Sequence, residues 1–271
     1  MIIDAHAHIG KRPNSNLEKL NFEQVLTLLL KEMKLNKVGH ALVIASYKKT
    51  NFNLSMAEEL SLIKDIKNLS AIGSLDVLNY KTTDLDLLDE LLSKKIIKGI
   101  KFHLGYQYFY PNEKICHPIY KLCIKHDAPA IFHTGDTLTI PGERPTKIKY
   151  THPIHIDDVA AEFPDLKIII AHMGNPWFMD CAEVLYKNDN VYADISGLVA
   201  DYADLNSPYG AMMKKKIQEL FIFSDPKKLL YGTDWPLASM KTYIKFTKSL
   251  GIPRKDLDYV FYKNAQKLFK I

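Results

Sequence analysis

Short apolar segments alternate with longer amphipathic segments along the whole chain. The short segments are rich in Ile, Val, Leu and Ala and turn polar only at their ends, which is typical of strands buried on both faces. We predict eight such strands, at residues 2–9, 38–46, 70–77, 97–104, 128–134, 166–173, 191–197 and 229–234.

The longer segments carry apolar residues at helical spacing. Within residues 22–35, for example, Val25, Leu29 and Met33 fall on one helix face. Ser55 precedes Glu58 by three residues, and this capping-box pair predicts where the next helix begins. We predict helices at residues 22–35, 55–67, 84–94, 113–126, 156–162, 179–187, 209–223 and 238–250, and a final helix at 254–269.

The order of these segments predicts an α/β fold. Strands that alternate with helices form right-handed parallel crossovers, and eight such units close a (β/α)8 barrel of roughly 250 residues. A doubly wound open sheet is the alternative, but its usual GxGxxG turn is missing after the first strand, where the chain reads Gly10-Lys11-Arg12-Pro13. No linker interrupts the alternation, so we predict a single barrel domain over residues 1–271.

Composition and charge exclude several classes of protein. The net charge of +5 is spread along the chain, and no basic stripe carries interleaved aromatic residues, which argues against a nucleic-acid partner. No apolar run approaches the roughly 20 residues that span a bilayer, and the first residues lack the pattern of a signal peptide. We therefore expect a cytoplasmic protein with no membrane partner.

The three cysteines do not suggest a metal site or a disulfide framework. Cys116, Cys123 and Cys181 are odd in number and lack CxxC spacing. We interpret them as small buried apolar residues in a reducing compartment.

Candidate chemistry begins in the first strand, with Asp4-Ala5-His6-Ala7-His8. Alternate residues of a strand share a face, so His6 and His8 are expected to project together, with Asp4 below them. Two imidazoles on one face form half of a metal site. A lone HxH pair is nevertheless more often two ordinary histidines.

Polar residues at the ends of later strands strengthen the metal interpretation. His133, His172 and Asp234 each stand where an apolar strand stops. In a closed barrel these ends converge on one axis, where imidazoles and a carboxylate suit a divalent ion with an open coordination position. Without an ion, burying such a cluster is costly.

The fourth strand and two long loops add candidate substrate contacts. Lys101 and His103 share a strand face that we expect to line the pocket. The loops after the fourth and fifth strands, at 105–112 and 135–155, are longer than a barrel needs and contain Tyr106 and Arg144. Asp194, on the seventh strand, is a candidate for orienting a histidine ring.

Seven motifs carry a family resemblance from one end of the chain to the other. They are DAHAH at 4–8, GIKFH at 99–103, FHTG at 132–135, FPDLKIIIAHMG at 163–174, VYADISG at 191–197, YGTDWP at 231–236 and NAQKLF at 264–269. With these motifs the chain resembles the amidohydrolase superfamily, and within it the amidohydrolase-related branch that contains the aminocarboxymuconate-semialdehyde decarboxylase group.

The resemblance implies a TIM-barrel enzyme with one divalent metal ion. The matching motifs make His6, His8, His133 and Asp234 the expected ligands, and place His172 beside the metal-bound water. Zinc is the usual ion of this branch, although manganese and others occur. Two-metal relatives carry a carbamylated lysine near the position of Lys101, but this branch normally lacks that bridge.

The sequence leaves three functions open. The first is hydrolysis of an amide, lactone or ester by a metal-activated water, with Asp234 and His172 catalytic. The second is non-oxidative decarboxylation of a small aromatic or unsaturated acid in the same site. The third is a catalytically silent barrel that only binds a ligand.

We expect a small cyclic or aromatic substrate that bears a carboxylate, and relatives of this branch are often homodimers. A carboxylate would suit the cations, above all Arg144, because a guanidinium can bind it with two parallel hydrogen bonds. The candidate substrate-binding residues are Lys101, His103, Arg144, Tyr106, Trp177 and Trp235.

Overall fold

Eight parallel strands form one sheet in chain order in the computed structural model, which describes residues 1–201 and 205–271. The strands are β1 (Ile3–Ala7), β2 (His40–Ile44), β3 (Leu69–Ser74), β4 (Ile97–Phe102), β5 (Ala130–His133), β6 (Ile168–Ala171), β7 (Val191–Asp194) and β8 (Leu229–Leu230). The sheet closes because the Ala5 amide donates to the Tyr231 carbonyl at 2.9 Å and the His8 amide donates to the Trp235 carbonyl at 2.8 Å. The predicted barrel is therefore confirmed.

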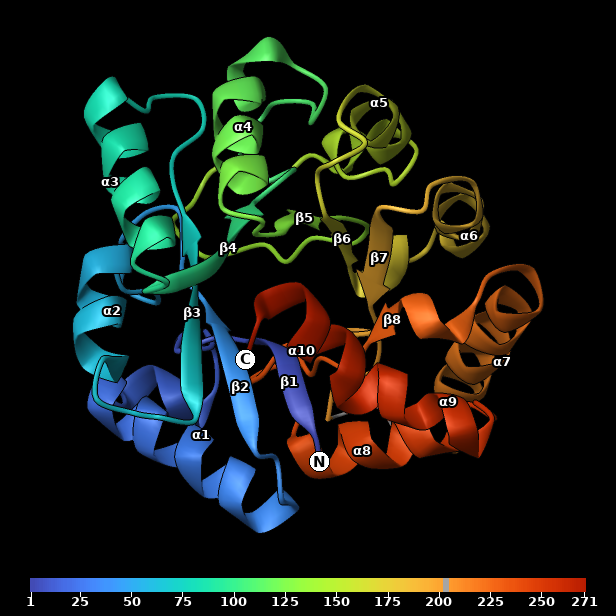
Figure 1. Ribbon diagram of the computed structural model, residues 1–271. Coiled ribbons are helices and arrows are strands. Elements are labelled where there is room, and N and C mark those ends of the chain that lie inside the picture. Colours follow the sequence, from blue (N-terminus) through green and yellow to red (C-terminus); the bar gives the residue numbers. More distant parts are fainter. Residues whose placement is uncertain (202–204) are drawn as a thin grey trace.

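Helices surround the sheet on its outside (Figure 1). They are α1 (Phe22–Asn36), α2 (Met56–Ile63), α3 (Thr82–Ser93), α4 (His117–Lys125), α5 (His155–Glu162), α6 (Phe178–Lys187), α7 (Pro208–Phe223), α8 (Met240–Ser249) and α9 (Arg254–Asp258). A π-helical turn, η6 (Tyr259–Lys263), joins α9 to α10 (Asn264–Phe269). The final helix predicted at 254–269 is therefore one helical segment with a π turn inside it.

Two apolar layers hold the barrel together. The interior layer contains Ile44, Ile72, Ile131 and Ile169, which come from β2, β3, β5 and β6, and Phe269 of α10 packs against them. In the view of Figure 1, α10 and the C-terminal end lie over the centre of the ring of strands. The outer layer lies between the strands and the surrounding helices. Side chains fill the barrel interior. A ligand therefore binds at the end of the barrel where the loops after the strands lie.

The inward face of β1 changes phase within the strand. Its pairing with β2 is irregular between Asp4 and Ala7. Ile3 and Ala5 pack in the barrel interior, whereas Ala7 packs in the outer layer. The expectation that Asp4 lies below His6 and His8 on one face is wrong, because this irregularity turns the imidazoles inward without it.

The eighth strand is shorter than predicted, at Leu229–Leu230 instead of 229–234. The chain leaves the regular ladder near Gly232, where an added Cβ would lie 2.8 Å from the Cβ of His6. It still donates from the Asp234 amide to the His6 carbonyl at 2.8 Å. Asp234 thus lies past the strand but directly beside β1.

The described part of the chain contains no helix that is both long and apolar enough to cross a membrane. Cys116, Cys123 and Cys181 are buried and free, as predicted.

Glu59 makes stability depend on pH. This α2 residue is 3% exposed, its Oε1 has no hydrogen-bond partner among the described residues, and burial raises its pKa from 4.5 to about 8. Between these values the folded state keeps a proton that the unfolded state has released. The free energy of unfolding therefore falls as pH rises through this range, by up to about 1.4 kcal/mol per pH unit.

We predict that Glu59→Gln removes this dependence. Relative to wild type, the variant should gain roughly 2–4 kcal/mol between about pH 5 and about pH 9 in urea unfolding. Glu183→Gln, on the exposed face of α6, is the control and should show no such gain. Equal behaviour of the two variants would contradict the prediction.

Candidate active site

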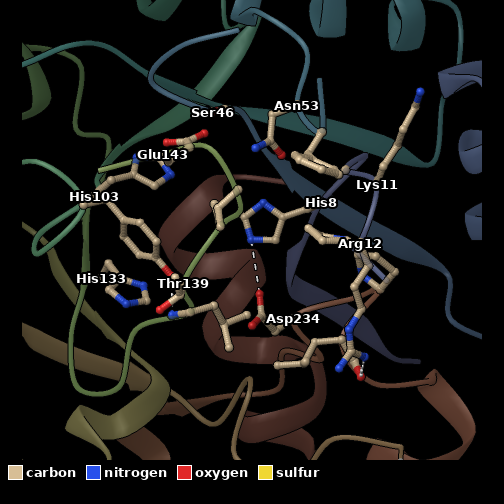
Figure 2. Close-up of a pocket in the computed structure, with 18 of the residues that line it drawn as sticks. His8, Lys11, Arg12, Ser46, Asn53, His103, His133, Thr139, Glu143 and Asp234 are labelled. Carbon is tan, nitrogen blue, oxygen red and sulfur yellow. Dashed lines mark hydrogen bonds and ion pairs between the residues drawn. The ribbon is translucent and has the colours of Figure 1, made fainter. Parts of the chain in front are cut away.

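A cavity of about 340 Å³ opens at the carboxyl ends of the strands. Its floor and walls combine strand-end residues with residues from the loops after β1, β2 and β5 (Figure 2). Residues around it include His6, His8, Lys101, His103, Tyr106, His133, His172 and Asp234, and the loop residues Arg12, Tyr47, Lys48, Asn53 and Glu143.

His6 and His8 present the same ring nitrogen to the cavity. His6 Nδ1 lies 2.8 Å from Asp194 Oδ2, and His8 Nδ1 lies 3.0 Å from the Ile44 carbonyl. A carbonyl or an ionised carboxylate can only accept, so each Nδ1 carries the proton and each Nε2 has a free lone pair. Those Nε2 atoms lie 3.7 and 3.2 Å from Asp234 Oδ1.

His133 and His172 also face each other with unprotonated nitrogens. His133 Nε2 donates to the Asp136 carbonyl at 2.9 Å, and His172 Nδ1 lies 3.1 Å from the Ser196 carbonyl. Their remaining nitrogens, His133 Nδ1 and His172 Nε2, are 3.1 Å apart. Two lone pairs at this distance repel unless a proton or a cation lies near both.

The backbone is strained where two site residues leave their strands. His172 has φ 62° and Asp234 has φ 59°, in the left-handed region that costs a non-glycine residue about 1 kcal/mol or more. Gly197 packs between them, also at positive φ, and an added Cβ would lie 2.9 Å from His172 Nδ1 and 3.1 Å from Asp234 Oδ2. The glycine at the end of the VYADISG motif is therefore required by this close approach.

Protonation states in the cavity favour cation binding at neutral pH. Burial lowers the pKa of His6 to about 3 and the pKa of His133 well below its usual range. Burial alone would raise the pKa of Asp234, but the His8, His172 and His6 rings beside it outweigh burial and hold that pKa well below its usual range. Neutral imidazoles and an ionised carboxylate are the forms that bind a metal.

The donor set fits a divalent transition metal. Ligand atoms of His6, His8 and Asp234 all lie within 4.8 Å of one another. Imidazole nitrogens with one carboxylate oxygen suit zinc better than magnesium or calcium, which prefer oxygen ligands. Asp194 forms a second such group with His6 and His172, but four protein donors already occupy its oxygens.

Lys101 and His103 line the cavity as expected. Lys101 Nζ lies 3.5 Å from His6 Nε2, and burial lowers the pKa of this amine to about 8. His103 Nδ1 lies 3.1 Å from Ser74 Oγ, and its ring packs 5.4 Å from that of Tyr47. Lys101 lies on the inward face of β4, and His103 is the first residue after this strand.

Tyr106 lines the cavity, but Arg144 does not. The Tyr106 ring packs edge-on to His133 at 5.0 Å. The Arg144 guanidinium donates twice to the Tyr106 carbonyl, at 3.0 and 2.8 Å, and lies 4.1 Å from the centre of the Tyr108 ring. Arg144 therefore joins the β4–α4 loop to the β5–α5 loop. It does not lie in the cavity lining, where a substrate-binding residue was expected.

The two tryptophans also lie outside the cavity lining. Trp177 packs against His152 at 4.6 Å, on the segment before α6. Trp235 is buried and faces a different hollow, one that Leu17 and Leu28 also line. Neither residue is brought to the predicted substrate site.

Sequence reasoning missed several cavity residues on loops. Lys48 Nζ forms an ion pair with Glu143 Oε2 at 2.7 Å, which connects the β2–α2 loop to the β5–α5 loop. Arg12 lies across the cavity from His103 in Figure 2, and its Nη1 donates to the Leu237 carbonyl at 3.3 Å. Loop residues follow no periodic pattern, although the charged pair Lys11-Arg12, three and four residues after His8, was a usable signal for Arg12.

The fold and the site together define a (β/α)8 barrel with candidate metal ligands at the carboxyl ends of its strands. Comparison with known proteins identifies the family: the model of the amidohydrolase family matches residues 3–271. The chain belongs to this family and is an amidohydrolase-type enzyme, which confirms the resemblance inferred from the motifs. No curated protein matches the chain.

Solved structures share this fold at low identity. A probable 2-pyrone-4,6-dicarboxylic acid hydrolase from Acinetobacter baumannii has a TM-score of 0.70 at 14% identity, covering 100% of this chain and 99% of that one. The 5-carboxyvanillate decarboxylase of Sphingomonas paucimobilis has 0.69 at 12%, with coverage of 100% and 99%. An amidohydrolase from Burkholderia multivorans with bound zinc has 0.69 at 14%, again with coverage of 100% and 99%.

We predict that Arg144→Met loosens the β5–α5 loop. Losing the contact to the Tyr106 carbonyl should cost about 1 kcal/mol. The amides of Leu138 and Lys147, which donate from the β5–α5 loop to Tyr106 and Gly105 of the β4–α4 loop, should then exchange roughly fivefold faster. Hydrogen exchange measures this. Lys149→Met is the control, because Lys149 also lies over a ring, Tyr150, in the same loop. Equal acceleration in both variants would count against the role of Arg144.

Proposed function

We propose that the protein is a hydrolase with one divalent ion, most simply zinc, and that it acts on a small cyclic or aromatic carboxylate with an amide, lactone or ester bond. The carrying observation is the set of imidazole nitrogens that face the cavity with free lone pairs beside an ionised Asp234. In this proposal His6, His8, His133 and Asp234 hold the ion. The solved neighbour with bound zinc supports the choice of metal.

The protein residues around the ion can move the protons of hydrolysis. A divalent ion bound there supplies Lewis acidity and lowers the pKa of water toward about 7. Asp234, 18% exposed at its side chain, is ionised and faces the cavity, so it can accept a proton from water and later deliver it to the leaving group. His172 Nε2 carries a lone pair and can hold the attacking water in line.

Charge around the cavity supports an anionic substrate. Lys11, Arg12, Lys48 and Lys101 bring four positive groups against the carboxylates of Asp234 and Glu143. Lys48 is already paired with Glu143. Arg12 is the guanidinium that lines the cavity, so we assign it the carboxylate contact that the sequence suggested for Arg144.

Decarboxylation is the second candidate, and the same positive groups support it. The neighbours include one named a dicarboxylic acid hydrolase and one named a decarboxylase, both with cyclic carboxylate substrates in their names. Release of carbon dioxide from aromatic acids, measured beside hydrolysis of lactones and amides by zinc-loaded protein, separates the two. A silent ligand-binding barrel would turn over neither set, and its metal would be absent or dispensable.

Three further expectations stay predictions from the sequence. They are a cytoplasmic location, the absence of a nucleic-acid partner and assembly as a homodimer. None of them is needed for the chemistry proposed here.

We predict that Asp234→Asn removes activity and weakens metal binding while the barrel remains folded, because an amide is both a poorer ligand and no base. Metal content, circular dichroism and kcat are the measurements. Asp165→Asn, exposed before β6 at the other end of the barrel, is the control. Retention of more than about a tenth of kcat, a loss below roughly 1.4 kcal/mol, would show that Asp234 has another role.

We predict that Arg12→Met raises KM for a carboxylate substrate by roughly ten- to a hundredfold, since a charge-assisted hydrogen bond contributes about 1.5–3 kcal/mol. The effect should vanish when the substrate carboxylate is replaced by a methyl ester. Arg254→Met makes the same chemical change at an exposed position of α9, outside the cavity lining, and serves as the control. A similar KM change in both variants would remove Arg12 from substrate recognition.

A further inference from the structure

Asp194, at the end of β7, is a buried carboxylate that accepts four hydrogen bonds. Its Oδ1 accepts from the amides of His172 and Ser196, both at 3.0 Å, and from the Ser196 hydroxyl at 2.5 Å. Its Oδ2 accepts from His6 Nδ1 at 2.8 Å. The residue is 1% exposed, so neither oxygen faces solvent.

The Ser196 hydroxyl connects Asp194 to His172. A serine has one hydroxyl proton, and here it is directed to Asp194 Oδ1. The Ser196 Oγ, 2.9 Å from His172 Nδ1, can therefore only accept a hydrogen bond from it. The Ser196 carbonyl, 3.1 Å from the same nitrogen, can also only accept. His172 must carry its proton at Nδ1 and leave Nε2 unprotonated.

Two other proposed metal ligands, His8 and His133, do not depend on a side chain in this way. Backbone carbonyls of Ile44 and Asp136 determine the protonated nitrogen of His8 and His133. Asp194 determines the protonated nitrogen of His6 directly, and it influences that of His172 through Ser196. One carboxylate thus contacts the His6 ring directly and the neighbouring His172 ring, 4.8 Å away, through the Ser196 hydroxyl.

We propose that Asp194 is a positioning residue that, together with Ser196, sets which ring nitrogen of His6 and of His172 carries the proton, so that both rings present an unprotonated Nε2 to the cavity. The consequence for metal binding rests on the function proposed above. A His6 ring with a proton on Nε2 would direct an N–H toward the metal position and could not bind the ion there.

The structure predicts what an amide at position 194 would do. Three donors converge on the Oδ1 position, so the amide oxygen of an asparagine must occupy it. The amide nitrogen then takes the Oδ2 position and donates to His6 Nδ1. His6 must accept there, and its proton must move to Nε2.

The test uses metal-free protein with ¹⁵N-labelled histidine, whose ring protonation is read by nitrogen NMR at neutral pH. In wild type, His6 and His172 should both be protonated at Nδ1. In Asp194→Asn, His6 should be protonated at Nε2, and zinc affinity should fall roughly ten- to a hundredfold. Signals are assigned with His6→Gln and His172→Gln.

Asp4→Asn is the matched control. Asp4 is also a buried carboxylate beside His6, but it accepts from the His6 amide and from Thr233 and touches no imidazole nitrogen. This variant should leave the protonated nitrogen of His6 unchanged.

The wild-type spectrum alone can overturn the proposal, even where Asp194→Asn does not fold: a proton on Nε2 of either ring refutes it. An unchanged His6 in folded Asp194→Asn, or zinc affinity within threefold of wild type, also refutes it. The ring measurement needs neither metal nor substrate. Failure of wild type to bind zinc would therefore count against the proposed function and leave the assignment of the ring protons standing.

Discussion

Pairing between the first strand and the segment after the last strand is the contact on which the site depends. The Asp234 amide donates to the His6 carbonyl, and the His8 amide donates to the Trp235 carbonyl, each at 2.8 Å. These bonds close the barrel, and they also place Asp234 Oδ1 within 3.2 Å of His8 Nε2. Without closure, Asp234 would lie apart from His6 and His8, and their ligand atoms would not come together.

The site concentrates features that are unfavourable for folding. Two residues adopt left-handed backbone conformations, and several imidazoles and carboxylates are buried. The rest of the barrel offsets this with a filled interior and a continuous outer apolar layer. The lone pairs of His133 and His172 would no longer repel if a cation lay near both, and such binding would stabilise the folded state.

Some residues of the loops around the cavity hold the loops together, and others line the cavity. Arg144 and Tyr108 hold the β5–α5 loop against the β4–α4 loop, with the Tyr108 hydroxyl donating to the Pro145 carbonyl. Arg12 and Lys101 stay beside the cavity and carry its positive charge. Hydrolases and decarboxylases can share this barrel because the donor set belongs to the strand ends, whereas the substrate contacts belong to the loops.

Sequence by itself determined the alternation of strands and helices, the barrel and the strand-end positions of His6, His8, His133, His172 and Asp234. Local apolar patterns and short motifs carry that information, since buried parallel strands must be apolar until their ends. Tertiary structure alone decided that β1 changes phase before His6, that Arg12 faces the cavity while Arg144 does not, and which ring nitrogens are protonated. These outcomes depend on hydrogen-bond partners that lie far away in the sequence, such as Asp194 for His6, and no local pattern records them.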